Sequence, residues 1–155
     1  MEVLKTIFGW NYILSVSIVG WCVAQVLKTL INLILMGKFD PERLWGAGGM
    51  PSSHSSTVCA MTVACARYVG VHSPTFAVAA VLAIIVMYDA MGVRRETGEQ
   101  AKVLNKMITD WMELGSANMR ILGDRKLKEM VGHTPFEVLS GAILGTAIGF
   151  AIPII

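Results

Sequence analysis

The stretch Gly48-Gly49-Met50-Pro51-Ser52-Ser53-His54-Ser55 runs directly into an apolar segment, and the rest of the chain is arranged around it. Its two glycines let the backbone approach a ligand closely, and Pro51 favours the start of a helix. A helix that begins here points its free N–H groups and the positive end of its dipole at the loop above it. The stretch therefore predicts an anion site, for phosphate in particular, with Gly49 in the loop and His54 beside it. The alternative is a serine N-cap on a membrane helix, in which His54 has no function.

The composition is typical of a membrane protein. Of 155 residues, 54% are hydrophobic and 15% are charged, and the mean hydropathy is +0.60, a balance unusual for a soluble domain. The length suits a single membrane-embedded domain over residues 1–155. The net charge is only +2, and the basic residues do not alternate with aromatic ones, so nucleic-acid binding is disfavoured.

Four apolar segments are predicted to span the membrane: residues 12–36, 52–69, 74–91 and 137–155. In residues 96–114, apolar side chains recur at i, i+3, i+4 and i+7 with charged ones between them. This spacing predicts an amphipathic helix on the membrane surface or against the bundle, and a further short helix is expected over residues 124–131. The expected fold is an all-α, multi-pass membrane bundle of about four spans, with an amphipathic helix at the cytoplasmic face.

Four spans place the polar connections 37–50 and 94–134 on one face of the membrane. Ten of the thirteen Lys and Arg residues lie in these two connections, and the positive-inside rule places that face in the cytoplasm. The same topology brings residues from separate segments to one place: His54, Asp89, Arg94, Arg95 and His133.

The charges near this face also have structural explanations. Asp89 lies within one turn of the end of an apolar span, where an ionisable group is usually functional, but a salt bridge to Arg94 or Arg95 is the alternative. The arginine pair suits phosphate geometry, and interfacial anchoring is its alternative. Lys28 lies about 12 Å below the face along its helix, and it either reaches a polar site between the spans or extends to the surface.

His133 and Glu137 stand four positions apart at the start of the last span. Thr134, Pro135 and Glu137 fit a capping box, which explains Glu137 but not His133. A carboxylate at this spacing also holds one imidazole nitrogen while the other faces a site, an arrangement used by nucleophilic and metal-bound histidines.

Small residues recur at every fourth position of the last span. Such a stripe lets membrane helices pack closely, either within one chain or between the chains of a homo-oligomer. The residues are Gly141, Gly145 and Gly149.

Together these motifs resemble the divergent branch of the phosphatidic acid phosphatase type 2 superfamily. The resemblance rests on residues 48–55, on residues 87–95 with Gln100 and Asn105, and on residues 128–138. The matching motifs occur in order and cover the chain from about residue 48 to residue 145.

The resemblance implies phosphatase chemistry that requires no metal or other cofactor. In the parent superfamily a histidine attacks phosphorus, a carboxylate four residues on orients it, and a second histidine protonates the leaving group. This implies His133 as nucleophile, Glu137 as its orienter and His54 as general acid. The expected phosphate-binding residues are Lys28, Ser52, Ser53, Arg94 and Arg95, and the expected supporting residues are Asp89, Gly49, Gln100 and Asn105.

The chain departs from the parent pattern in its phosphate clamp. The first parent motif, a lysine separated by six residues from Arg-Pro, is absent, and Lys28 is only a loose substitute. Leu127 stands where an arginine should precede the nucleophile by six positions, although Arg94 and Arg95 could replace it from another helix. The orienting aspartate has become Glu137, which is one methylene longer.

Three hypotheses follow. The first is hydrolysis of a lipid or isoprenoid phosphate ester at the cytoplasmic face, with membrane lipids as surroundings and an anionic phosphorylated lipid as substrate. The second is a non-catalytic binder or transporter of anionic lipid headgroups that uses the same pocket. The third is a zinc or manganese site built from His54, Asp89, His133 and Glu137.

Overall fold

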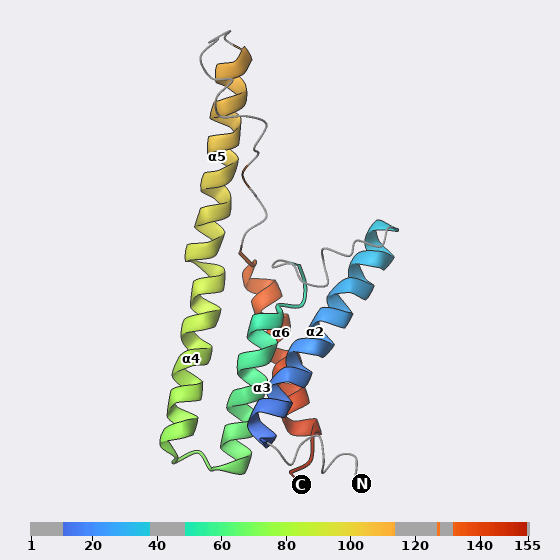
Figure 1. Ribbon diagram of the computed structural model, residues 1–155, viewed down its shortest axis with the longest axis vertical. Helices are drawn as coiled ribbons and strands as arrows, with labels where there is room; N and C mark the ends of the chain where they lie inside the picture. The colour runs from blue at the N-terminus through green and yellow to red at the C-terminus, as the bar shows by residue number, and fades with distance from the viewer. Residues whose placement is uncertain (1–10, 38–48, 114–126, 128–131, 155) are drawn as a thin grey trace.

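A computed structural model describes residues 11–37, 49–113, 127 and 132–154 (Figure 1). Within these ranges every regular element is a helix and there is no strand, so the predicted all-α fold is confirmed for this part of the chain. The helices are α2 (Tyr12–Met36), α3 (Ser53–Tyr68), α4 (Pro74–Met91), α5 (Val93–Glu113) and α6 (Pro135–Ala151).

Most of the helices begin at polar caps. The side chains of Asn11, Ser52, Ser73 and Thr134 each accept a hydrogen bond from a backbone N–H in the first turn of α2, α3, α4 and α6. These bonds satisfy N–H groups that have no partner within the helix. The predicted starts of the first three spans agree with these caps to within one residue, and α6 begins two residues earlier than predicted.

α3 lies at the centre of the bundle, with α2, α4 and α6 packed against it (Figure 1). Small residues allow the close approach. A Cβ on Gly20 of α2 would lie 2.9 Å from the Cβ of Ala60, and the Ser56 hydroxyl donates to the Gly20 carbonyl at 2.9 Å. Because a hydroxyl buried between apolar helices must find a partner, this bond also fixes the register of α2 against α3.

The glycine stripe of α6 packs against α3 of the same chain. A Cβ on Gly141 would collide with the backbone carbonyl of Ser52, and a Cβ on Gly145 would collide with that of Ser56. Of the two alternatives for the stripe, the structure supports the internal helix pair. The three glycines, with Gly149 the third, are buried in this contact, so they do not offer a free surface for a homo-oligomer.

Arg67 closes the opposite end of the bundle, where α6 ends. Its guanidinium donates to the carbonyls of Gly149, Phe150 and Ile152 at 2.6, 3.1 and 2.7 Å, and Tyr12 of α2 donates to the Ile152 carbonyl at 3.0 Å. A cation on the last carbonyls of a helix satisfies them and opposes the negative end of the helix dipole. This charge within a predicted span is therefore structural.

The predicted grouping of helix ends is confirmed. The first residues of α2, the turn between α3 and α4 and the last residues of α6 lie at one end of the bundle (Figure 1). The end of α2, the starts of α3 and α6, and the junction of α4 with α5 lie toward the other end. The site predicted from the sequence falls at this second end.

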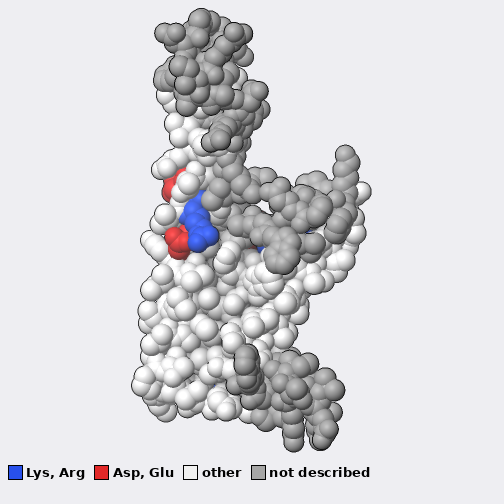
Figure 2. Space-filling model, viewed as in Figure 1, with Lys and Arg blue, Asp and Glu red and all other residues white. Residues whose placement is uncertain are grey.

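Two helical stretches are long and apolar enough to cross a membrane, Tyr12–Ile34 and Pro74–Asp110. α6 is apolar but shorter, and α3 has 16 residues with serines in its first turn. Length and composition therefore support two of the four predicted membrane spans, the first and the third. The outward flank of α4 is apolar, and on the face shown in Figure 2 the charged side chains gather near its junction with α5.

The position expected for the amphipathic helix is wrong. α5 neither lies across the bundle end nor packs against the bundle; it continues the direction of α4 and projects beyond the other helices (Figure 1). Gly92, with φ −99° and ψ −95°, separates the two helices. The predicted helix at 124–131, apart from Leu127, and most of the loop 37–50 lie outside the described residues.

Candidate active site

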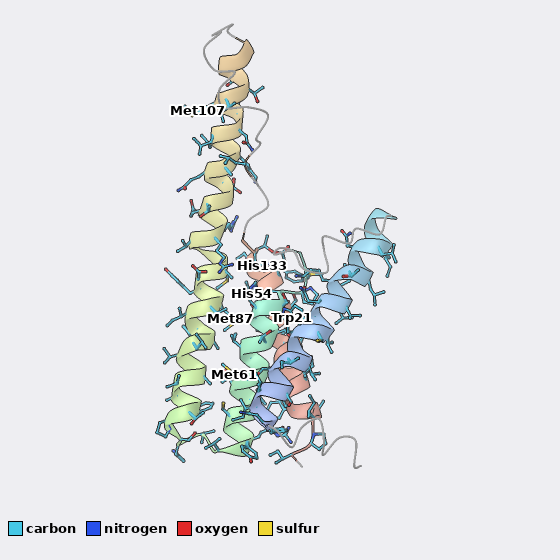
Figure 3. The ribbon with its side chains drawn as sticks, viewed as in Figure 1. Trp21, His54, Met61, Met87, Met107 and His133 are labelled. Atoms are coloured by element: carbon cyan, nitrogen blue, oxygen red, sulfur yellow. The ribbon has the colours of Figure 1, made fainter. Side chains whose placement is uncertain are left out.

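A cavity of about 220 Å³ lies where α3 and α6 begin and where α4 meets α5. Four chain segments contribute to its wall, and Figure 3 shows the two histidines close together between the starts of α3 and α6. The lining residues are His54, Ile85, Val86, Asp89, Ala90, Arg94, Gly132 and His133. Four of the predicted site residues are therefore brought together around one space.

His133 is held by its backbone as well as by its side chain. Its N–H donates to the carbonyl of Ala90 at 3.0 Å, near the end of α4, where carbonyls lack helical partners. Gly132 has φ +89° and lies so close to the backbone of Arg94 and Arg95 that a Cβ would collide with it. Only glycine fits both the conformation and the contact.

Glu137 belongs to the capping box of α6 and also contacts the His133 ring. Nδ1 of His133 lies 3.1 Å from Oε2 of Glu137, and this oxygen also accepts the N–H of Thr134 at 3.0 Å. The N–H of Glu137 donates to the Thr134 hydroxyl at 3.3 Å. Because Glu137 engages Nδ1, Nε2 is the imidazole nitrogen that remains for a ligand.

The surroundings of His133 favour its neutral form. Its side chain is 3% exposed, and this burial, which is the largest influence, lowers its pKa from the ordinary value of 6.5. The hydrogen bond and the negative charge of Glu137 act in the opposite direction, while the positive charges of Lys28 and Arg94 lower the pKa further. A neutral imidazole is the form that can act as a nucleophile.

His54 comes from the first turn of α3 and is the more exposed of the two histidines. The ring centroids of His54 and His133 are 6.3 Å apart, and the ring planes meet at 61° (Figure 3). This separation leaves room for a small group between the rings. The expectation that topology brings the two histidines together is met by the geometry.

Arg94 is engaged with a carboxylate of the same cavity. Its Nε lies 2.7 Å from Oδ2 of Asp89, and the side chains are 51% and 40% exposed, respectively. The salt bridge considered as an explanation for Asp89 is therefore present. Arg95 is exposed and does not line the cavity, so the two adjacent arginines do not occupy equivalent positions.

Lys28 and the serines lie behind the cavity wall. Lys28 is 2% exposed, and its Nζ donates to the Ser53 hydroxyl at 3.5 Å, so it reaches into the polar region between the helices. Ser52 is fully buried, and its hydroxyl accepts from the hydroxyl and the N–H of Ser55. The N-cap explanation thus holds for Ser52, and neither serine lines the cavity.

Comparison with known proteins agrees with this arrangement. Residues 10–148 match the Divergent PAP2 family. The chain belongs to this family. A relative from Bacillus subtilis (strain 168), named as the uncharacterized membrane protein YuiD, is 40% identical over 141 residues, which are 87% of this chain and 89% of the relative. No solved structure matches the chain.

Three residues expected to support the site in this Divergent PAP2 protein do not line the cavity. Gly49 has φ +84° in the turn before α3. Gln100 is exposed on α5. The Asn105 amide exchanges two hydrogen bonds of 2.9 Å with the backbone of Leu127, so it ties α5 to the chain that leads back to His133.

Four residues that line the cavity were not predicted from the sequence: Ile85, Val86, Ala90 and Gly132. Ile85 and Val86 stand at i−4 and i−3 from Asp89, so helical spacing from this carboxylate could have indicated them. Ala90, at i+1, carries no such signal. Ile85, Val86 and Ala90 all belong to α4. They give the cavity an apolar wall on the α4 side.

The structure does not support the zinc or manganese hypothesis. Among the described residues, no three His, Cys, Asp or Glu side chains are grouped so that they could hold a metal ion. The carboxylate of Asp89 is engaged with Arg94, and that of Glu137 is engaged with His133 and Thr134. Both carboxylates of the proposed ligand set therefore have other partners.

Proposed function

We propose that this Divergent PAP2 protein is a membrane phosphatase that hydrolyses a lipid or isoprenoid phosphate ester through a histidine nucleophile. The observation that carries the proposal is the His133 imidazole, which is oriented by Glu137 at 3.1 Å and faces His54 at 6.3 Å across a cavity shared with Arg94. A nucleophile, an orienter, a second proton-transfer group and a cation are the groups that phosphoryl transfer to histidine requires.

The reaction proceeds in two steps. Nε2 of His133 attacks phosphorus, the P–N bond forms as the ester P–O bond breaks, and His54 gives a proton to the departing alcohol. A water molecule, deprotonated by the now neutral His54, then attacks the phosphohistidine and releases phosphate. Glu137 stabilises the positive charge on the His133 ring, and the charges of Arg94 and Lys28 offset the negative charge on the phosphoryl oxygens.

The surroundings favour a substrate that lies in a membrane. Ile85 and Val86 line the cavity on the α4 side, and Ile85 is also 58% exposed, so the cavity wall continues into the apolar flank of the helix. α4 contains a single charge, Asp89, close to its end. In the proposed arrangement α2, α3, α4 and α6 all cross the membrane, and the cavity opens at the cytoplasmic face.

The three histidines of the chain give a matched test. Purified protein is incubated with a panel of lipid and isoprenoid phosphates, and phosphate release is measured for wild type, His133→Ala, His54→Ala and His72→Ala. The first two variants should lose roughly two to four orders of magnitude in rate. His72 lies in the exposed turn before α4, so its variant should retain wild-type activity. Absence of phosphate release by wild type above His133→Ala across the panel rules the phosphatase out.

The alternative is a non-catalytic binder or transporter of anionic lipid headgroups. It is favoured by the incomplete phosphate clamp, since Ser52 and Ser53 are buried and Leu127 replaces an arginine. In that case Arg94→Gln should abolish headgroup binding while His133→Ala leaves it nearly unchanged. Equal losses in both variants would argue against a binder.

A further inference from the structure

Asp89 places a negative charge in the wall of the cavity that is proposed to bind phosphate. Its Oδ2 lies 2.7 Å from Nε of Arg94, and both side chains line the same space as His54 and His133. A carboxylate in this position repels the phosphate that the guanidinium attracts. Phosphate binding alone does not explain the presence of Asp89.

The pair is not a routine salt bridge along one helix. Side chains on one helix face meet at i,i+3 or i,i+4, whereas Asp89 and Arg94 are five positions apart. They meet across Gly92, whose backbone interrupts the helix between α4 and α5. The N–H of His133 donates to the Ala90 carbonyl beside the same interruption. The ion pair and the candidate nucleophile are therefore positioned by one local feature.

The pair can also exchange partners. Both side chains are about half exposed, and ion pairs of this exposure contribute little to stability. A guanidinium has five N–H donors in a planar fork that matches phosphate oxygens. A doubly charged phosphate is therefore a stronger partner for Arg94 than a single carboxylate is.

We propose that Asp89 competes with bound phosphate for Arg94, limits the affinity of the site and so promotes release of the phosphate product. This rests on the proposed function, because it takes the cavity as the place where the phosphoryl group binds. When phosphate enters, Arg94 turns from Asp89 to a phosphoryl oxygen; when phosphate leaves, Asp89 binds the guanidinium again. Asp89 is a positioning residue, since it acts through Arg94.

The test is the affinity of the full-length protein, in detergent micelles, for inorganic phosphate measured by calorimetry. Asp89→Asn keeps an oxygen that can accept from Arg94 but removes the negative charge. The Kd for phosphate should fall by about tenfold or more, because phosphate then no longer has to displace a charged carboxylate from Arg94. Multiple-turnover kcat should fall with it, since phosphate then leaves more slowly.

Glu99→Gln is the matched control. Glu99 pairs with Lys102 at 2.9 Å, its side chain is 54% exposed, and it does not line the cavity. Its variant should bind phosphate as wild type does. Arg94→Gln supplies the second comparison, because without the guanidinium the gain from Asp89→Asn should largely disappear.

Three results overturn the proposal. Asp89→Asn binds phosphate no more tightly than wild type, or Glu99→Gln gains as much, or the gain persists in the Arg94→Gln background. If Asp89→Asn does not fold, NMR of the arginine Nε groups of the wild-type protein tests whether Arg94 changes partner. The Arg94 signal must shift when phosphate is added, and an unchanged signal at saturating phosphate contradicts the competition.

Binding of inorganic phosphate requires no turnover, so the two proposals fail separately. A protein that shows the expected Asp89 effect but hydrolyses no lipid phosphate disproves the phosphatase and retains the competition. A protein that hydrolyses lipid phosphates with an unchanged phosphate Kd in Asp89→Asn retains the phosphatase and disproves the competition.

Discussion

The backbone N–H of Ser52 donates to the backbone carbonyl of Glu137 at 3.0 Å, which joins the start of α3 to the first turn of α6. Ser52 precedes His54 by two positions and Glu137 follows His133 by four, so this bond ties the two histidine-bearing segments to each other. It forms because Gly141, one turn further along α6, lets the helix approach the Ser52 carbonyl. The packing of the bundle therefore determines the geometry of the candidate site.

Gly145→Ala is expected to destabilise the bundle by about 1–3 kcal/mol. The added Cβ would meet the backbone carbonyl of Ser56, which cannot rotate away as a side chain can. The loss should appear as a lower midpoint of thermal unfolding in detergent. Ile143→Ala is the control on the same helix, because Ile143 is 62% exposed. A Gly145→Ala variant as stable as wild type would contradict the internal packing of the stripe.

Arg67→Gln should lower stability without changing the chemistry of the site. The substitution removes charged hydrogen bonds to the carbonyls of Gly149 and Ile152, and each such bond is worth about 1.5–3 kcal/mol. Arg67 lies at the end of the bundle opposite the cavity, so the folded fraction should bind phosphate normally. Arg67→Lys should recover part of the stability. Loss of phosphate binding at unchanged stability would show that Arg67 has a different role.

The His133 imidazole should titrate below pH 6.5, because burial lowers its pKa more than the hydrogen bond to Glu137 raises it. Glu137→Gln removes a contribution that raises the pKa, so the midpoint should fall further. NMR of labelled histidine checks both statements, with His133→Ala identifying the resonance. A midpoint above 6.5, or an upward shift in Glu137→Gln, would contradict the assignment.

The lowered pKa of His133 also makes the stability of the protein depend on pH. Since the unfolded chain binds the His133 proton at a higher pH than the folded protein does, acid favours unfolding. Stability should decrease as the pH falls from 6.5 through the lowered pKa of His133 and show no further loss from this group below it. In His133→Ala this component of the pH dependence of unfolding should be absent.

The sequence predicted helix starts and the grouping of helix ends because these depend on local signals. Ser52, Ser73 and Thr134 are caps that act within one turn. The distribution of Lys and Arg indicates which connections between helices lie on the same face of the membrane. The direction of α5 could not be predicted in this way. It depends on the backbone conformation of Gly92, and a glycine permits either a continued or a bent path. Gln100 and Asn105 were expected to support the site because of the family resemblance, and they lie on α5, outside the cavity lining.

The hydrophobic pattern of α4 did not predict the composition of the cavity wall, for which the position of Asp89 was the one signal. α4 is apolar on all sides, so the pattern does not reveal which face turns toward His133. In the structure, Ile85 and Val86 lie on the side of α4 that lines the cavity. Asp89 was identified because a single carboxylate in an apolar segment is energetically costly and is usually functional. An isoleucine in the same segment carries no such signal.

Ile85→Ser should reduce kcat/KM for a long-chain lipid phosphate by roughly tenfold, since about two buried methylene groups of contact are lost. The prediction follows from the place of Ile85, which lines the cavity one turn below Asp89 and is 58% exposed on the flank of α4. Ile84→Ser is the control, because Ile84 is the same residue type, is 64% exposed and does not line the cavity. The loss should reside in KM, and the Kd for inorganic phosphate should be unchanged in both variants because phosphate has no apolar chain. Equal losses in Ile84→Ser and Ile85→Ser would show that the apolar flank as a whole, rather than the cavity wall, receives the lipid.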